Sequence, residues 1–267
     1  MVAKVIDSAS NNCYVIDNQN SIKGFSFSNG DIKRLDVDIA SNMRPVMMDA
    51  DSEWVAIASR SRDVQIMNPL GTQLCKIDTG YRNNVLKLAT KWGLIGVSSD
   101  TQISDIIQIY NFEQKYPNRI LQLYAKVRDF VFMRDSSSML VSLSRNDLCF
   151  WDLRSRNKYN SLYIGEMDAK EIVPMNSNKV SILDANGRQM LYDVRYTRGE
   201  YWVIENDVNG RYLSASYDVE SSMMSVIYDN KIEVYDTYLD KVFEKEQDFT
   251  SYTILASSMR ANLLRIL

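Results

Sequence analysis

Six short stretches of the chain share one pattern of apolar and polar positions: an alternating run, then a large residue, then Asp or Asn. The pattern is clearest at residues 107–111, 148–152 and 232–236, and it also ends at Asp17, Asn68 and Asp193. An alternation with a period of two is typical of a half-buried β-strand. In residues 232–236 we therefore expect Ile232 and Val234 on a buried face and Glu233 on an exposed one.

Further strands are predicted around each of these stretches. A preceding apolar run is joined to the stretch by a short polar turn, which predicts a hairpin; these runs are residues 54–58, 139–143 and 225–228. A strand is predicted after the stretch at 72–77, 120–124, 201–204 and 242–245. An additional first strand is predicted at 85–89, 127–132, 171–175 and 212–216. Four short antiparallel strands therefore recur in each period.

The spacing of the repeats indicates a β-propeller. Successive anchoring Asp or Asn residues lie 41 to 51 residues apart, a period typical of propeller blades. Sixteen residues precede Asp17 and 31 follow Asp236, which together make 47, one more period. We predict an all-β fold of six four-stranded blades in a single domain over residues 1–267.

Two ways of completing the ring follow from this count. In the first, residues 253–256, and also 263–267, complete the blade that begins with residues 2–6 and 13–16, so that the two termini close the ring. In the second, the ring is open and a partner supplies the missing strands, or the chain is part of a larger propeller. Closure hides the strand edges that otherwise invite aggregation.

One of the six anchors is a Trp-Asp pair, Trp151-Asp152, and the others read Tyr-Asp, Tyr-Asn, Met-Asn or Ile-Asp. In this the chain resembles the WD-repeat β-propeller family over its whole length. The family commonly carries a buried His-Asp hydrogen bond, which this chain cannot form because it has no histidine. The resemblance therefore implies structural anchors, Asp17, Asp152, Asp193 and Asp236, whose carboxylates accept hydrogen bonds from backbone N–H groups or hydroxyls.

The absence of histidine also bears on chemistry. It removes the usual general base near neutral pH, the Ser-His and Cys-His nucleophile pairs, and the commonest zinc ligand. No C-x-x-C pair, G-x-S-x-G turn or phosphate-binding glycine loop is present. We expect a protein that is not an enzyme and that holds neither a cofactor nor a metal.

Composition predicts an intracellular protein, cytoplasmic or nuclear, without membrane insertion. Hydrophobic residues make up 45% and charged residues 24% of the chain, and no apolar run approaches the roughly 20 residues of a membrane helix. The three cysteines, Cys13, Cys75 and Cys149, fall inside predicted strands. Their odd number and wide separation predict buried free thiols in a reducing compartment.

Seven arginines fall in turns that the strand assignment places on one face of the propeller: Arg60, Arg62, Arg82, Arg128, Arg145, Arg188 and Arg211. Guanidinium groups bind carboxylates and phosphates through paired hydrogen bonds, so these residues are candidate sites for a protein partner with acidic or phosphorylated segments. The same turns carry many aspartates, and the net charge is -3. Broad attraction to nucleic acid is therefore not favoured.

The turn around residues 152–158 is the densest basic segment of the opposite face, with Arg154, Arg156 and Lys158. With nearby tyrosines it provides an alternative, an RNA- or DNA-associated subunit of a ribonucleoprotein or chromatin complex. The leading hypothesis is a noncatalytic scaffold that mediates protein-protein interactions within a multi-subunit assembly, because a rigid propeller fixes many loops in known relative positions.

Overall fold

The computed structural model describes residues 3–246 with internal gaps. The gaps are residues 10–11, 18, 29–30, 40–42, 51–52, 90–92, 102–103, 112–116, 118, 124, 134–135, 137, 156–157, 166, 177, 187, 196–200, 205–210, 219–220 and 239.

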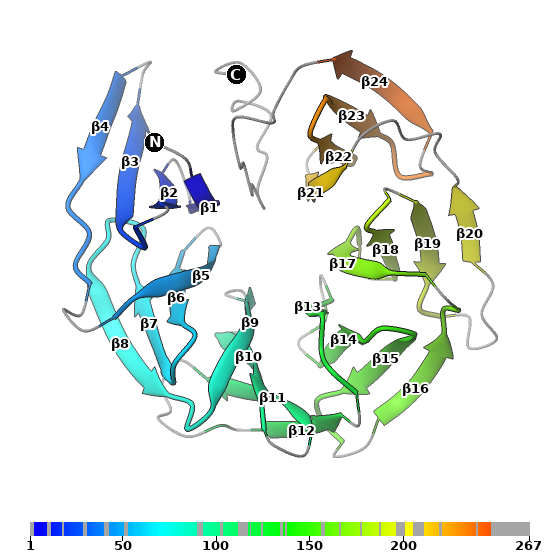
Figure 1. The fold of residues 1–267 in the computed structure, drawn as a ribbon, viewed down its shortest axis with the longest axis horizontal. Helices are drawn as coiled ribbons and strands as arrows, with labels where there is room; N and C mark the ends of the chain where they lie inside the picture. The colour runs from blue at the N-terminus through cyan, green and yellow to red at the C-terminus, as the bar shows by residue number, and fades with distance from the viewer. Residues whose placement is uncertain are drawn as a thin grey trace. The chain divides into compact units, whose positions relative to one another are not determined.

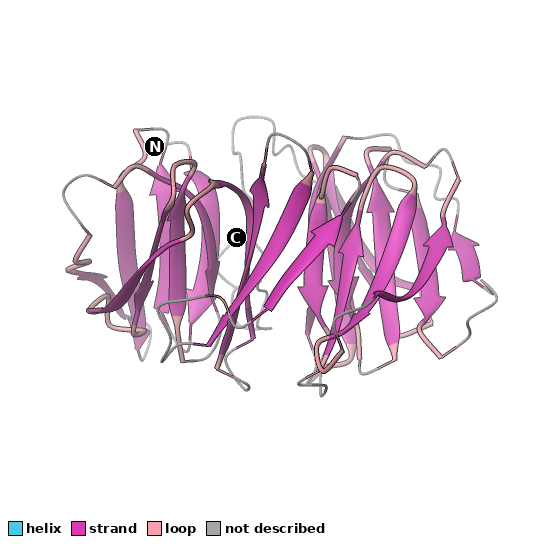
Figure 2. Cartoon of the chain, turned by 90° about the horizontal axis from the view of Figure 1, so that it is seen from below, coloured by secondary structure: helices cyan, strands magenta, loops and turns pink. Residues whose placement is uncertain are grey.

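The fold is a β-propeller of six blades, each a four-stranded antiparallel sheet with its strands in chain order (Figure 1). Within the described residues there is no helix, and Figure 2 shows strands and loops alone. None of the described segments is a helix capable of crossing a membrane. The prediction of six four-stranded blades is confirmed.

Contacts divide the chain into two compact units, which we describe separately. Unit 1 holds three blades. Blade 1 consists of β1 (Ala3–Ala9), β2 (Asn12–Asp17), β3 (Ile22–Ser28) and β4 (Asp31–Leu35). Blade 2 consists of β5 (Pro45–Ala50), β6 (Val55–Ser59), β7 (Asp63–Met67) and β8 (Gln73–Asp78). Blade 3 consists of β9 (Arg82–Ala89), β10 (Leu94–Asp100), β11 (Asp105–Asn111) and β12 (Arg119–Leu123).

Unit 2 holds the other three blades. Blade 4 consists of β13 (Asp129–Phe132), β14 (Met139–Leu143), β15 (Asp147–Asp152) and β16 (Lys158–Tyr163). Blade 5 consists of β17 (Ala169–Pro174), β18 (Lys179–Asp184), β19 (Gln189–Asp193) and β20 (Tyr201–Ile204). Blade 6 consists of β21 (Tyr212–Asp218), β22 (Met223–Tyr228), β23 (Lys231–Tyr235) and β24 (Lys241–Glu246). The expectation of a single domain stays a prediction.

The strands follow the predicted positions closely, because each hairpin is marked by alternating apolar residues around a polar turn. The second and third strands of blade 4, for example, pair in register from Leu143 and Leu148 to Met139 and Asp152. Within each unit, the first strand of a blade contacts the first strand of the next blade: β1 with β5 and β5 with β9, and β13 with β17 and β17 with β21. The first strands therefore link neighbouring blades.

Blade 1 differs from the expected arrangement. Its four strands all come from residues 3–35, so this sheet reaches four strands without a C-terminal strand. The polar stretch 22–35, which the sequence analysis left unassigned, forms β3 and β4. Residues 253–256 and 263–267, which we expected to complete this blade, lie outside the described residues.

The expectation of half-buried signature strands is wrong for most of these strands. In β23, Ile232 is 3% and Glu233 1% exposed, and in β7 the side chain of Gln65 is fully buried, whereas β15 keeps an alternation of half-buried and buried residues over 147–150. In blade 2 the reason is that blades 1 and 3 pack on the two faces of its sheet, so the polar positions of the alternation point into a blade interface and not toward water. Alternation here marks two different buried faces.

The cores of both units lie between consecutive blades. One cluster joins blades 4 and 5 through Val141, Phe150 and Ile172, and another joins blades 2 and 3 through Ile66 and Ile95. All three cysteines are free and lie in strands as predicted, but only Cys13 is buried. Cys75 and Cys149 are half-buried because they lie in or beside the outer strands of their blades.

Candidate functional site

Loops of two kinds meet at one end of every blade. In a four-stranded antiparallel meander, the turn between the second and third strands lies at the same end as the connection into the first strand. We call this end the arginine face. It carries Arg60, Arg62 and Arg82 in unit 1 and Arg128, Arg145, Arg188 and Arg211 in unit 2.

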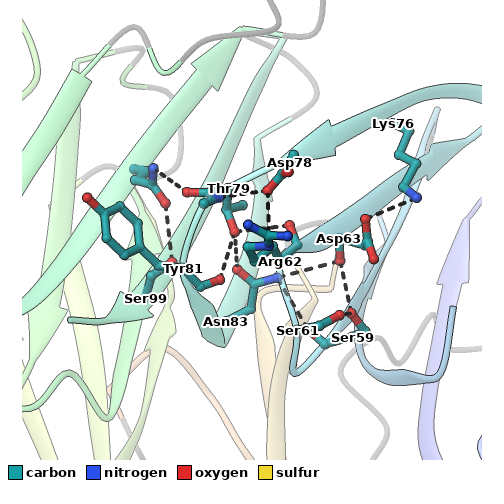
Figure 3. Close-up of polar contacts among 12 residues, drawn as sticks. Ser59, Ser61, Arg62, Asp63, Lys76, Asp78, Thr79, Tyr81, Asn83 and Ser99 are labelled. Atoms are coloured by element: carbon teal, nitrogen blue, oxygen red, sulfur yellow. Dashed lines mark hydrogen bonds and ion pairs between the residues drawn. The ribbon is translucent and has the colours of Figure 1, made fainter. Parts of the chain in front are cut away.

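On the arginine face of unit 1, a buried polar network joins blades 2 and 3 (Figure 3). Thr79, in the connection between the blades, donates its N–H to the carbonyl of Arg62 (2.9 Å), and its hydroxyl lies 2.8 Å from Oδ1 of Asn83. The amide of Asn83 donates to the carbonyl of Ser59 (3.2 Å), and Nε2 of Gln108 donates to the carbonyl of Thr79 (3.0 Å). These hydrogen bonds fix the loops that contain Arg60, Arg62 and Arg82.

The arginine side chains of unit 1 are not used by this network. Among the described residues, the Arg62 side chain forms only a long ion pair with Asp78 (3.9 Å), in which both side chains are about two-thirds exposed, at 65% and 63%. Such exposed pairs contribute little to stability. Arg60 and Arg82 are exposed, and no described residue forms a hydrogen bond or ion pair with either guanidinium. Both groups are therefore available to a partner.

In unit 2, Arg128 connects blades 4 and 5. Its Nη1 donates to the carboxylate of Asp168 and to the carbonyl of Ala169 (2.9 Å). Next to it, the buried carboxylate of Asp129 accepts from the backbone N–H of Ile172 in β17 (3.0 Å). Arg128 is therefore mainly a structural contact between blades, with 30% of its side chain exposed.

Several positively charged side chains act on the carboxylate of Asp168. The hydrogen bond from Arg128 lowers the pKa of Asp168, and attraction from Lys170 and Arg145 lowers it further. Lys170 and Arg145 are exposed, and neither forms a hydrogen bond or ion pair with the described residues. At the junction of blades 4 and 5, Arg128 therefore pairs with this carboxylate, while Lys170 and Arg145 add positive potential without a direct contact.

The other two arginines of unit 2 differ from each other. Arg188 donates Nε to the buried carboxylate of Asp184 (3.0 Å), which also accepts from the Arg188 backbone N–H (2.9 Å). Its charge is thus partly neutralised within blade 5. Arg211 uses its backbone N–H, which donates to Asp229 (2.8 Å), while its exposed guanidinium has no partner among the described residues.

On the opposite face, the basic turn after β15 is less positive than its sequence indicates. Nε and Nη2 of Arg154 both donate to the carboxylate of Asp152, at 3.0 and 2.8 Å, and the backbone N–H of Arg154 donates as well. These bonds lower the pKa of Asp152 to about 2. Arg156 lies outside the described residues. The paired charges of Asp152 and Arg154 weaken this turn as a site for nucleic acid.

The anchoring aspartates cap the turns that follow their own strands. The Oδ1 atom of Asp17 accepts from the backbone N–H groups of Gln19 and Ser21, both at 2.9 Å, and Asp236 accepts in the same way from Tyr238 and Asp240. Asp193 accepts from the backbone N–H of Arg195, as Asp152 does from Arg154. Asn68 receives two backbone bonds of this kind. Backbone donors thus take the place of the missing histidine.

Blade 6 contains a buried ionic cluster that sequence reasoning missed. The carboxylate of Glu233 accepts from Nζ of Lys231 (2.8 Å), Nζ of Lys241 (3.2 Å) and the hydroxyl of Tyr235 (2.5 Å). Burial raises the pKa of Glu233, but these three hydrogen bonds outweigh it and hold the pKa below its usual value. A sequence signal for this cluster was present in Lys231 and Lys241, which lie near Glu233 in the chain. The interpretation of the strand as half-buried instead placed Glu233 in solvent.

Within the described part of the chain, no group of three or more Cys, Asp or Glu side chains is arranged to hold a metal ion.

Comparison with known proteins supports the fold. No protein-family model matches the chain, and no curated protein matches it in sequence. Raptor from Chaetomium thermophilum is similar in structure, with a TM-score of 0.71 and 12% identity, over 92% of this chain and 24% of the Raptor chain. Hydrazine synthase from Kuenenia stuttgartiensis is also similar, with a TM-score of 0.69 and 10% identity over 88% and 76% of the two chains.

At such identities the likeness shows the propeller fold alone. The chain also spans only about a quarter of the Raptor chain it matches.

Proposed function

We propose that the chain is a noncatalytic, WD-repeat-like propeller that acts as a protein-interaction scaffold within a multi-subunit intracellular assembly. One observation carries this proposal: Arg60, Arg82, Arg145 and Arg211 are exposed and have no hydrogen-bond or ion-pair partner among the described residues, although each stands at the same end of its blade. A fold that fixes loops rigidly while leaving their charged groups unused is suited to binding. Guanidinium groups favour partners with carboxylates or phosphates.

The arginine face can be tested by charge reversal. We expect the triple variant Arg60→Glu, Arg62→Glu and Arg145→Glu to weaken binding of the main copurifying partner about tenfold or more, because each change replaces attraction by repulsion at the interface. The melting temperature should change little, since exposed charges contribute little to folding. Quantitative affinity purification followed by binding measurements with the purified partner checks this.

A matched control is available on the outer strands. The triple variant Lys33→Glu, Arg34→Glu and Lys245→Glu makes the same change in net charge on exposed positions of β4 and β24. It should leave partner binding intact. If the control removes the partner and the arginine-face variant does not, the binding face is assigned wrongly.

The nucleic-acid alternative has weaker support because Asp152 neutralises Arg154. We expect a single-stranded RNA probe to bind only weakly at physiological salt, and we expect Arg154→Glu with Lys158→Glu to leave partner binding unchanged. Binding of the probe across a salt series measures this. Tight RNA binding that falls steeply with salt and is lost in the double variant would instead favour the ribonucleoprotein role.

A further inference from the structure

The junction of blades 4 and 5 contains a cluster of positively charged side chains, and a carboxylate of the same chain, Asp168, occupies it. Asp168 lies in the connection between β16 and β17 and is more than half exposed, with 56% of its side chain accessible. Arg128, from the connection into β13, donates to it. Arg145 belongs to the adjacent turn between β14 and β15, and Lys170 lies at the start of β17.

Backbone hydrogen bonds hold these elements in place. The N–H of Arg128 donates to the carbonyl of Leu143 (2.8 Å), which sets the start of blade 4 beside the turn that carries Arg145. The connection that carries Asp168 is fixed at both ends: Ile164 N–H donates to the Asn146 carbonyl (2.8 Å), and the Asp168 carbonyl accepts from Ala185 (3.2 Å). The backbone positions of the cations are therefore fixed, so a ligand has only their side chains to order.

Two cations at this site are not used by the protein itself. Arg128 pairs with Asp168, whereas Arg145 and Lys170 leave all of their donors unused by the described residues. A phosphorylated side chain carries a charge close to -2 at neutral pH and three acceptor oxygens, which suits two exposed cations better than the single charge of a glutamate.

We propose that the junction formed by Arg128, Arg145 and Lys170 binds a phosphorylated side chain of a protein partner, and that Asp168 competes with this ligand for the same cations. The proposal rests on the scaffold function above and gives it a specific ligand. The phosphate accepts hydrogen bonds from Arg145 and Lys170, while Arg128 is shared with Asp168. Asp168 thereby holds Arg128 in position in the free protein and lowers the affinity for weakly charged segments.

The test uses the purified full chain and a short labelled Gly/Ser peptide with one phosphoserine, measured by fluorescence anisotropy at low salt. Asp168→Asn is expected to tighten peptide binding by about threefold to tenfold, because it removes one nearby negative charge from an exposed site. Arg145→Glu with Lys170→Glu is expected to abolish binding. The same peptide with glutamate or unmodified serine in place of phosphoserine should bind more weakly than the phosphopeptide.

Two matched controls accompany these variants. Asp240→Asn removes the same charge from an exposed position on the opposite face of blade 6, and Lys33→Glu with Lys245→Glu reverses two charges at exposed positions of β4 and β24; neither control should change binding. Equal binding of the glutamate and phosphoserine peptides, or weaker or unchanged binding by a folded Asp168→Asn variant, overturns the proposal.

The outcome is separable from that of the scaffold proposal. If the peptide binds as expected but the triple charge reversal leaves every partner in place, the phosphate site stands and the scaffold assignment fails. If the reversal removes the partner but the peptide does not bind, the scaffold assignment stands and the phosphate site fails.

Discussion

Replacing Glu233 by Ala is expected to lower the free energy of unfolding by about 3 to 5 kcal/mol, the range for removing one partner of a buried ion pair. The side chain of Glu233 is 1% and that of Lys231 11% exposed. The substitution leaves the Lys231 ammonium and the Tyr235 hydroxyl without their shared, buried acceptor. Urea unfolding followed by tryptophan fluorescence measures the loss.

Two further variants separate charge from packing at this site. Glu244→Ala removes a carboxylate that is 36% exposed and that pairs with the same lysines, and it should cost no more than about 1 kcal/mol. Replacing Lys231 and Glu233 together by Met should recover much of the loss, because an apolar pair of similar volume avoids the unpaired charge. A loss below about 1 kcal/mol in Glu233→Ala would contradict the buried ionic cluster.

Asp193→Ala is expected to lower the free energy of unfolding by about 1 to 3 kcal/mol. The Asp193 carboxylate is 3% exposed and accepts from the backbone N–H (3.0 Å) and Nε (2.9 Å) of Arg195. Its removal leaves the backbone N–H of Arg195 without its acceptor. Asp152→Ala makes the matching change at an anchor that is 27% exposed, and it should cost less because water can replace the carboxylate.

The pH dependence gives an independent check on Asp193. Hydrogen bonding by Arg195 lowers the pKa of Asp193 in the folded state, and burial opposes this. A lowered pKa means that the stabilisation is complete above the unfolded-state pKa of about 4 and is lost as the pH falls toward the folded-state value. The stability difference between the wild type and Asp193→Ala should therefore be constant near neutral pH and shrink in acid. A difference that stays unchanged down to about pH 2 would show that the carboxylate charge is not involved.

The strands could be predicted from the sequence because each blade is built from local hairpins. The signals are short-range: period-two alternation, a polar turn, and an Asp or Asn that caps the following turn through groups two to four residues away. The capping role of Asp17 and Asp236 could be inferred for the same reason. The resemblance to WD repeats added the expectation of structural anchors. The absence of histidine directed attention to backbone donors, which the structure shows, but the additional side-chain donors Arg154 and Arg195 were not expected.

Features that depend on neighbouring blades could not be predicted in this way. The burial of Glu233 and Gln65 arises because another blade covers the second face of their sheet, and alternation within one strand carries no information about that cover. The seven arginines could be assigned to turns, but only the structure separates Arg145, which forms no ion pair with the described residues, from Arg188, which pairs with Asp184. Asp168 was missed because its connection has no repeated motif.

The way the turns are capped has a consequence for unfolding. Each anchoring aspartate is satisfied within its own blade, whereas a separate set of polar contacts, including those of Asn83 and Asp129, crosses from one blade to the next. Stability in repeat architectures is approximately the sum of the intrinsic stability of each repeat and the coupling between neighbours. Weakening a crossing contact lowers the coupling while leaving the individual blades intact. Such a change reduces the cooperativity of unfolding more than it reduces overall stability. In Asn83→Ala, the unfolding transition of unit 1 should therefore become broader, while its midpoint shifts little.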